Sequence, residues 1–159
     1  MVDVRLRPMT QHEYDAWWRG AIAEYAEDNV RTGSMPADSA QEMAAKQFAE
    51  LLPDGLDTQG QHLLVAEDGG ERVGVFWVHI RPGQEGTEAF IYDITVEEAL
   101  RGRGYGRAAM VAGETFAREH GAKSVILHVF EDNTAARSLY QSLGYKTSIH
   151  MGKSLTDGA

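Results

Sequence analysis

The feature that most constrains this chain is the run RGRGYGR at residues 101–107, which follows an apolar stretch and precedes an amphipathic one. It alternates three arginines with three glycines: Arg101, Gly102, Arg103, Gly104, Gly106 and Arg107. Glycines let backbone N–H groups approach an anion closely, and a helix that begins here points its positive dipole end at the same place. The arginines add charged donors. The run therefore predicts a strand-to-helix turn that binds a ligand carrying more than one phosphate.

Two common phosphate-binding motifs do not match this run. A dinucleotide fingerprint needs glycine at the sixth position from Gly102, where this chain has Arg107. A nucleoside-triphosphate loop needs the string G-x-x-x-x-G-K-[ST], which does not occur. A tight turn surrounded by solvated arginines is the simplest structural interpretation, but the position of the run between a strand and a helix favours a phosphate site.

Hydrophobic periodicity predicts an α/β (α+β) fold. Alternation predicts a first strand at residues 2–6, and capping boxes predict helices after Thr10 and Ser39, with Glu13 and Glu42 as partners. The remaining expected elements are strands at 62–67, 73–80 and 88–96, a helix at 105–120, a strand at 125–130, a helix capped by Asn133 and a strand at 145–151. The strand at 125–130 follows a helix, so we expect it to lie parallel to 88–96. The prediction is one domain over residues 1–159, with a mixed central sheet of about six to seven strands and about four helices.

Composition excludes several classes of function. The net charge of -9 argues against a nucleic-acid partner, and no apolar run is long enough to span a membrane. Residues 1–100 hold 19 acidic and 7 basic residues, whereas residues 101–159 hold 5 acidic and 8 basic. The chain has no cysteine, which excludes disulfides, thiolate metal sites and any cysteine-linked covalent intermediate. We expect no metal site and, because residues 1–10 lack the apolar core of a signal peptide, a cytoplasmic location.

From residue 88 to residue 151 the chain resembles the GNAT superfamily of acetyl-CoA-dependent N-acetyltransferases. The family signature, Arg or Gln, two residues, Gly, one residue, then Gly or Ala, is matched by residues 101–106. Upstream, FIYDITV is similar to the strand that precedes the family's loop. Downstream, LHVFEDNTAARSLYQSLGY is similar to its strand, helix and turn, with Asn133, Ala136, Tyr140 and Gly144 in place. One departure is Glu98, where the family often has proline.

The resemblance implies an acetyl-CoA site. The pyrophosphate would lie on the backbone N–H groups of residues 102–107, and the pantetheine arm would bond to the main chain where the strand at 88–96 splays from its parallel neighbour. The residues that the resemblance assigns to the cofactor are Ile94, Thr95, Val96, Arg101, Gly102, Arg103, Gly104, Tyr105, Gly106, Arg107, Asn133, Ala136 and Tyr140.

Acetyl transfer from a thioester to an amine also needs an acid and a base. Tyr140 resembles the family tyrosine whose hydroxyl lies near the thioester sulfur, although its spacing fits a core position equally well. Asn133 resembles a residue that contacts the pantetheine arm, and it fits a helix cap at the same time. Glu88 and Asp93 are the two candidate bases. Their odd separation predicts opposite faces of the strand, so that only one faces the site.

Other groups remain candidates for moving the proton. His79 and His128 lie on expected strands, where a lone histidine is more often structural. An ordered water chain is a further route, and a backbone N–H near Val96 is a candidate oxyanion donor.

The leading hypothesis is an enzyme that transfers acetyl from acetyl-CoA to a primary amine by direct attack in a ternary complex. We expect a small-molecule or peptide acceptor to lie against the first two helices, where Glu24, Glu27 and Asp28 favour a cation. The alternatives are a non-catalytic CoA-binding sensor or interaction module of the same fold and a nucleotide-binding switch protein. The acceptor class, whether amino acid, polyamine, antibiotic or protein N-terminus, and a homodimer are left open.

Overall fold

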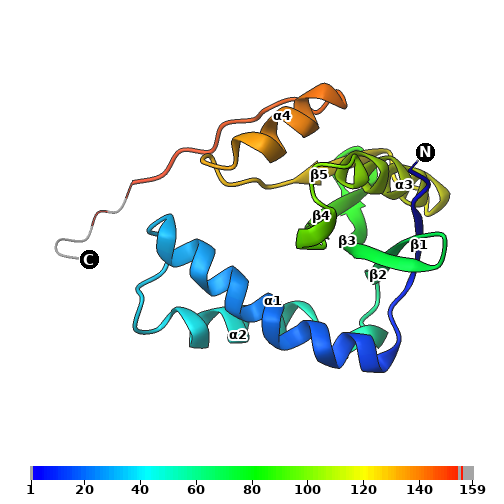
Figure 1. Ribbon diagram of the computed structural model, residues 1–159. Helices are drawn as coiled ribbons and strands as arrows, with labels where there is room; N and C mark the ends of the chain where they lie inside the picture. Colours follow the sequence, from blue (N-terminus) through cyan, green and yellow to red (C-terminus); the bar gives the residue numbers. More distant parts are fainter. Residues whose placement is uncertain (1, 154, 156–159) are drawn as a thin grey trace.

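The computed structural model describes residues 2–153 and 155, and within them it contains a five-stranded sheet with four α-helices (Figure 1). The strands are β1 (Arg5–Pro8), β2 (Gln61–Asp68), β3 (Glu71–Gly83), β4 (Gly86–Val96) and β5 (Ser124–Leu127). The helices are α1 (Gln11–Arg31), α2 (Ala40–Leu51), α3 (Tyr105–Glu119) and α4 (Thr134–Ser142). A short 3-10 turn, η2 (Glu98–Leu100), connects β4 to the glycine-rich loop.

The strands follow the sheet in chain order, β1-β2-β3-β4-β5. The first four pair antiparallel, and β5 pairs parallel to β4 across the α3 connection. Both the α/β class and the βαβ unit that carries the glycine-rich loop are therefore confirmed.

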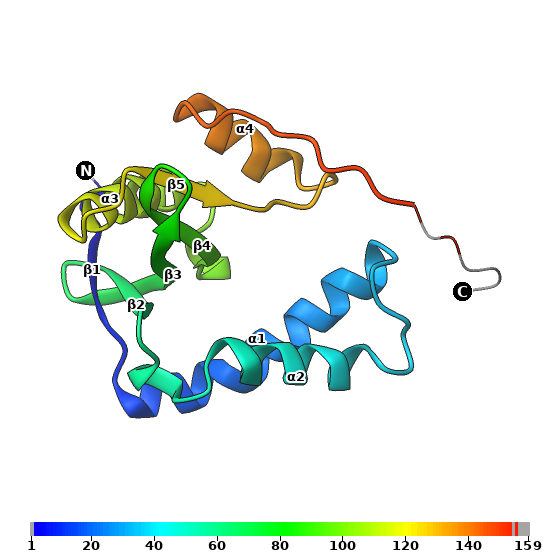
Figure 2. The ribbon, with the colours of Figure 1, turned by 180° about the vertical axis from the view of Figure 1, so that it is seen from behind.

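The two faces of the sheet are covered by different helices, as Figures 1 and 2 show from opposite sides. On one face α1 and α2 bury an aromatic cluster that includes Trp77, Phe48 and Tyr14. On the other face α3 buries its own Met110 in a cluster with Phe76 of β3. Helix α3 approaches the sheet closely at Gly113. If this residue carried a Cβ, that atom would lie 2.2 Å from the Phe76 ring. A larger residue there would force the helix away from the sheet.

The capping box predicted at the start of α1 is present. The Glu13 N–H donates to Thr10 Oγ1 at 3.2 Å, and the Thr10 N–H donates to Glu13 Oε1 at 2.9 Å. The second predicted box is wrong, because Ser39 makes no side-chain cap and its hydroxyl donates to Met43 Sδ instead. Within the described residues no helix is both long and apolar enough to cross a membrane.

The predicted number of strands is too high. Residues 145–151 were expected to form a final strand, but they carry no strand pairing in this structure, and β5 ends at Leu127 rather than at residue 130. A strand pattern in the sequence becomes a strand only when a neighbouring edge accepts its hydrogen bonds. Within the described part of the chain no such edge lies beside residues 145–151.

A β-bulge interrupts β4 at the centre of the sheet. Trp77 lies opposite Asp93 and Val78 lies opposite Ile91, so Tyr92 is an extra residue on β4. The extra residue places Tyr92 and Asp93 toward the face that α1 covers, and the Tyr92 ring stacks on Trp77 with 4.7 Å between centroids. Bulges redirect side chains in this way where a strand must turn a group toward a site.

Candidate active site

The glycine-rich loop opens onto a cavity of about 360 Å³ between the end of β4, the start of α3 and α4. The predicted cofactor residues that line it are Val96, Arg101, Gly102, Gly104, Tyr105, Gly106 and Arg107. Three further lining residues were not predicted: Leu100, Ala135 and Leu139. The loop and α4 are brought together only by the fold, since about thirty residues separate them in the sequence.

The backbone of residues 102–107 is rich in free donors. In the described structure none of these six N–H groups donates to a backbone carbonyl or a side-chain acceptor. Gly102 and Gly104 have φ angles of 78° and 90°, in the left-handed region that favours glycine. With no Cβ on either residue, open space lies beside them. A cluster of unpaired N–H groups at a helix N-terminus is a binding site for phosphate oxygens.

The arginines of the loop have different partners. Arg101 Nε donates to the Val96 carbonyl at 3.1 Å, which braces the turn. Arg107 Nη2 donates to Ser142 Oγ at 2.5 Å, which ties the first turn of α3 to the end of α4. Arg103 is exposed and does not line the cavity. The Tyr105 hydroxyl donates to Asp68 Oδ2 at 2.9 Å and so anchors the loop to the β2–β3 turn.

The parallel strands β4 and β5 separate where the bulge in β4 begins. Their pairing runs only from Glu88 with Ser124 to Ile91 with Leu127. The remainder of β4, residues 92–96, therefore has β3 on one side and no strand on the other. This is the splay that the resemblance to GNAT enzymes implied.

The free side of β4 presents main-chain amides to the gap. Glu97 donates its N–H to Val73 of β3, and paired and unpaired positions alternate along an antiparallel ladder. The N–H groups of Ile94 and Val96 consequently point away from β3, toward the gap. Thr95 does not, and its hydroxyl instead donates to Asp93 Oδ1 at 2.9 Å.

Helix α4 forms the wall opposite the loop. Asn133 caps it, with Oδ1 accepting from the Ala136 N–H at 3.2 Å, as predicted. Neither Asn133 nor Ala136 lines the cavity, because the helical phase turns Ala135 and Leu139 toward it instead. Tyr140 is half-buried among the apolar side chains on the α3 side of the sheet. Burial, and then the nearby Asp93 carboxylate, raise the pKa of its phenol.

Asp93 is the titratable group in the centre of this region. Burial raises its pKa to about 6, an effect opposed by hydrogen bonds from the Thr95 hydroxyl and the Trp17 indole. Two carboxylates of α1, Glu24 and Asp28, raise the pKa further through their charge. A carboxyl with a pKa near neutrality in a partly enclosed site is suited to accepting and releasing a proton.

The prediction that Glu88 and Asp93 lie on opposite faces of the strand is wrong. The extra residue at the bulge changes the alternation, so both carboxylates point to the α1 side. Glu88 is nevertheless engaged elsewhere, since its Oε2 accepts from Arg81 Nε at 2.9 Å near the start of β4. Asp93 is thus the carboxylate of the pair that lies beside the splay.

Two acidic residues of α1, Glu24 and Asp28, lie one turn apart, and their charges are among the main causes that raise the pKa of Asp93. Asp28 also pairs with Arg31 at 3.2 Å, and Arg31 reaches Asp132 after β5. The end of α1 is therefore connected to the segment between β5 and α4.

The two candidate histidines lie at the margins of this region. Burial lowers the pKa of His79, whose Nδ1 is buried without a hydrogen-bond partner among the described residues. His128 packs edge-on against the Phe90 ring. No group of three or more possible metal ligands is brought together in the described part of the chain.

The family model described as "Acetyltransferase (GNAT) family" matches residues 18–145, which is most of the chain. The chain belongs to the GNAT acetyltransferase family. Members of this family use acetyl-CoA, and the match spans the loop, the splay and α4.

Similar proteins cover 90% or more of this GNAT chain. The chain is 36% identical over 154 residues to YycN of Bacillus subtilis, an uncharacterized N-acetyltransferase, covering 96% of this chain and 99% of YycN. A crystal structure of YycN superposes with a TM-score of 0.88 over 97% of this chain and 99% of that one. Mycothiol acetyltransferase of an Arthrobacter strain is 30% identical over 145 residues, covering 90% of this chain and 42% of that enzyme.

A more distant structure shares the fold alone. AAC(6')-Iy, solved in complex with the bisubstrate analog CoA-S-monomethyl-acetylneamine, is 17% identical and superposes with a TM-score of 0.62. It covers 96% of this chain and 97% of its own.

Proposed function

We propose that this GNAT protein transfers the acetyl group of acetyl-CoA to a cationic primary amine by direct attack in a ternary complex. The observation that carries the proposal is the cavity that Val96, at the splayed end of β4, shares with five of the six residues 102–107, whose backbone N–H groups have no partner in the described structure. Such a donor cluster suits a pyrophosphate, and the exposed main-chain amides of Ile94 and Val96 suit an extended amide-containing arm.

The residues present fit acetyl-CoA on their donor chemistry. When bound, acetyl-CoA supplies an activated acyl group as a thioester. Backbone N–H groups bind the phosphates, with Arg101 and Arg107 beside them on the cavity wall. The Val96 N–H, which points into the gap, is the proposed oxyanion donor.

Asp93 is the proposed general base. An amine reaches the protein as an ammonium ion, and it must lose a proton before its nitrogen can attack a carbonyl. With a pKa of about 6, Asp93 is mostly ionised at neutral pH and still basic enough to accept that proton. The charges of Glu24 and Asp28 on α1 favour a cationic acceptor beside Asp93.

Tyr140 is the proposed general acid. In the transfer a bond forms between the amine nitrogen and the acetyl carbon, the carbon–sulfur bond breaks, and the thiolate takes up a proton. The Tyr140 hydroxyl makes no hydrogen bond to any residue that the structure describes, and burial keeps it protonated by raising its pKa. It is therefore available to donate to the departing sulfur.

Thiol release from acetyl-CoA tests the proposal. We expect release to depend on an added amine when amino acids, polyamines, aminoglycosides and peptide N-termini are screened, with cationic amines the best acceptors. If acetyl-CoA binds but none of these amines increases thiol release above hydrolysis, the protein is instead the non-catalytic CoA-binding module.

The Tyr140→Phe variant tests the assignment of the acid. It removes the proton donor while keeping the ring, so we expect kcat to fall by about 100-fold or more with little change in the affinity for acetyl-CoA. Tyr145→Phe is the matched control, because Tyr145 packs beside Tyr140 but its hydroxyl is bonded to Glu114 at 2.8 Å. Equal kcat values for both variants would remove Tyr140 from the mechanism.

A further inference from the structure

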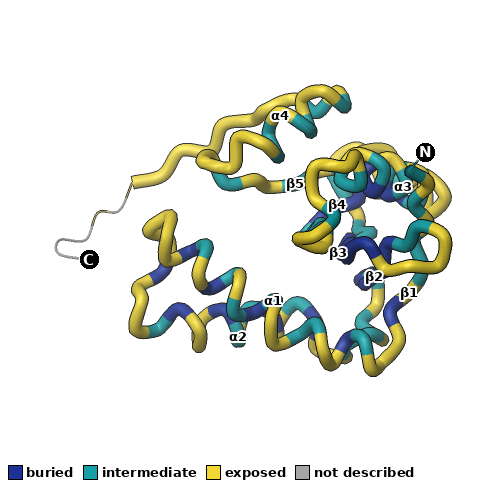
Figure 3. Tube along the Cα trace, viewed as in Figure 1, coloured by how far each residue is buried: buried dark blue, intermediate teal, exposed yellow. Residues whose placement is uncertain are grey.

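The centre of the sheet contains a buried pair of polar groups that the proposed function does not use. The Trp77 indole Nε1 on β3 donates to Gln61 Oε1 on β2 at 2.7 Å. Gln61 is 7% exposed and Trp77 is 2% exposed, and Figure 3 shows dark blue, buried stretches where β2 and β3 lie beside each other. Among the described residues, the only other buried amide side chain is Asn29. A buried amide is costly unless its polar atoms are bonded, so the partners of Gln61 decide what it does.

The Gln61 side chain is bonded at both ends of its amide. Its Nε2 donates to the Leu51 carbonyl at the end of α2 at 3.4 Å, while its Oε1 accepts from Trp77. If the Trp77 ring rotated, the indole N–H would be left without a partner in the core. Gln61 therefore fixes one orientation of the Trp77 ring relative to α2.

Trp77 is connected to the proposed base in three ways. It lies directly opposite Asp93 in the β3–β4 ladder. The ring of Tyr92, the bulged residue that precedes Asp93, stacks on Trp77 with 4.7 Å between centroids. The Trp17 ring of α1 meets Trp77 edge-on at 5.5 Å, and the Trp17 indole also donates to the Asp93 carboxylate. The position of the Trp77 ring thus affects both the bulge and one hydrogen bond of Asp93.

We propose that Gln61 and Trp77 are positioning residues for Asp93: their hydrogen bond fixes the ring against which the bulge packs, and so fixes the direction of the Asp93 carboxylate. This inference rests on the proposed function, in which Asp93 accepts the proton of the amine. Neither Gln61 nor Trp77 lines the cofactor cavity. They act through Tyr92 and Trp17, which contact or adjoin Asp93.

A base carried on a bulge needs such a support. The bulge interrupts the regular ladder, so the backbone hydrogen bonds hold Asp93 less tightly than they hold a residue in an uninterrupted strand. A catalytic group misplaced by about 1 Å loses about 100-fold in rate. The Thr95 hydroxyl holds one Asp93 oxygen from within β4 at 2.9 Å, so loss of the Gln61 support should loosen the carboxylate without releasing it.

The Gln61→Met variant tests the proposal. It keeps the length of the side chain but removes the amide that bonds to Trp77. We expect kcat/KM for the amine to fall by about 10-fold, with the affinity for acetyl-CoA unchanged. Trp77→Phe removes the donor of the same hydrogen bond and should act in the same direction. In the Trp77→Phe background, Gln61→Met should add little, because the bond is already absent.

The titration of Asp93, followed by NMR of its carboxyl carbon, is a readout that a purely structural role of Gln61 would not change. The hydrogen bond from Trp17 lowers the pKa of Asp93, so weakening it in Gln61→Met should raise that pKa above its value of about 6. The midpoint of the pH profile of kcat/KM should move with it. The groups that interact with Asp93 through charge are unchanged in these variants: Glu24 and Asp28 on α1, and Tyr140 on α4.

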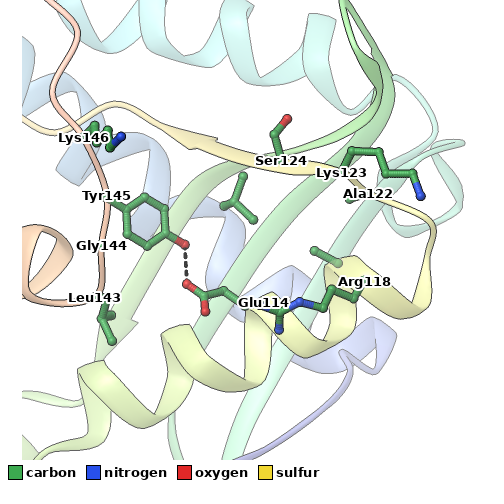
Figure 4. Close-up of a pocket in the computed structure, with 11 residues that line it drawn as sticks. Glu114, Arg118, Ala122, Lys123, Ser124, Leu143, Gly144, Tyr145 and Lys146 are labelled. Carbon is green, nitrogen blue, oxygen red and sulfur yellow. Dashed lines mark hydrogen bonds between the residues drawn. The ribbon is translucent and has the colours of Figure 1, made fainter.

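Two matched controls each lose a part-buried hydrogen bond elsewhere. Tyr25→Phe removes a bond of 2.8 Å to Gln47 Oε1 in the same aromatic cluster, where the Tyr25 ring packs on Phe48. Tyr145→Phe removes a bond of 2.8 Å to Glu114 on the other face of the sheet, at a cavity of about 520 Å³ (Figure 4). Both controls should leave the pKa of Asp93 and kcat/KM unchanged.

Two results would overturn the proposal. The first is a pKa of Asp93 and a kcat/KM in Gln61→Met that match those of Tyr25→Phe, because Gln61 would then contribute to stability alone. The second is an equal effect of Gln61→Met with and without Trp77→Phe, because the hydrogen bond would then not be the connection. Failure of the proposed function is a separate result. If Asp93→Asn keeps the full rate, Asp93 is not the base, yet its titration still shows whether Gln61 positions the carboxylate.

Discussion

The two halves of the candidate active site are built in different ways. The half assigned to the cofactor consists of consecutive residues, 101–107, that use main-chain N–H groups on a backbone held open by glycines. The half assigned to the acceptor consists of Asp93 on β4 with Trp17, Glu24 and Asp28 on α1. Those groups lie about seventy residues apart in the sequence, and they act through their side chains.

This difference determines which kinds of substitution should impair each half of the site. Main-chain donors are present whatever the side chains are, so a phosphate site of this kind depends mainly on backbone conformation. A base with a tuned pKa depends on each neighbour that buries it, bonds to it or repels its charge. We therefore expect substitutions that change the backbone conformation or fill space to impair the cofactor half. We expect the removal of a single charge to impair the acceptor half.

The largest expected effect is on the cofactor half. Gly104→Glu adds a side chain and a negative charge where φ is 90° and the cavity is lined by N–H groups. Because like charges placed together cost several kcal/mol, we expect the affinity for acetyl-CoA to fall by about 100-fold or more. Isothermal titration calorimetry with acetyl-CoA measures this.

A matched control lies at the other end of the same helix. Gly121 follows α3 and has a φ of 85°. As at Gly104, no other atom lies within 4 Å of the position that a Cβ would take. Gly121→Glu therefore carries the same backbone strain, about 1 kcal/mol, and the same charge. It should bind acetyl-CoA normally. Equal loss of binding in both variants would show that strain, rather than the site, is responsible.

The next effect is on the acceptor half. Asp93→Asn keeps the hydrogen bond from Thr95 possible but removes the proton acceptor. We expect kcat/KM for the amine to fall by about 100-fold, with the affinity for acetyl-CoA unchanged. Glu88→Gln is the control. Glu88 lies on the same face of the strand as Asp93 but is ion-paired with Arg81, so kcat/KM of this variant should change little. A greater loss from Glu88→Gln than from Asp93→Asn would reassign the base.

The pKa of Asp93 predicts opposite pH trends for rate and stability. The rate should rise as pH increases through about 6, where the base ionises, and this rise should be absent in Asp93→Asn. The folded pKa lies above the unfolded value of 3.8, so this group's contribution to stability is greatest below 3.8 and is lost as pH rises through about 6. Asp93→Asn should thus be more stable than the unmodified protein at pH 7, by up to about 3 kcal/mol, but not at pH 3. Thermal unfolding at both pH values measures this.

The smallest expected effect comes from removing the two α1 charges that act on Asp93. The double variant Glu24→Gln, Asp28→Asn removes two charges that raise the pKa of Asp93. We expect the pH profile of kcat/KM to shift to lower pH and KM for a cationic amine to rise about 5-fold, as for partly exposed charges. Glu27→Gln is the control, since Glu27 lies on the same helix but is not among the main causes that raise the pKa of Asp93. Identical profiles for these variants and the unmodified protein would place the acceptor elsewhere.

Most of the cofactor half was predictable because its signals are local. The spacing of Gly102, Gly104 and Gly106 placed the loop between a strand and a helix, and the structure has it there. Asn133 was correctly predicted as a helix cap. Leu100, at the end of η2, was missed, and so were Ala135 and Leu139, since which face of α4 meets the loop depends on packing rather than on spacing. The cofactor contacts themselves stay predictions.

The errors in the acceptor half and at the C-terminus have a common origin. Glu88 and Asp93 were wrongly predicted to lie on opposite faces of the strand, because a single bulged residue, Tyr92, reverses the alternation, and the letters FIYDITV do not mark it. The strand at residues 145–151 was predicted from alternation that is present, but pairing requires an edge.

The sequence by itself determined most of the order of helices and strands, the position of the glycine-rich loop and the resemblance to GNAT enzymes, because each depends on neighbours within a few residues. Only the tertiary structure decided which carboxylate lies beside the splay, what raises its pKa and which strand remains without a partner. Burial, charge proximity and hydrogen-bond pairing are relations between distant residues, so they exist only once the chain is folded.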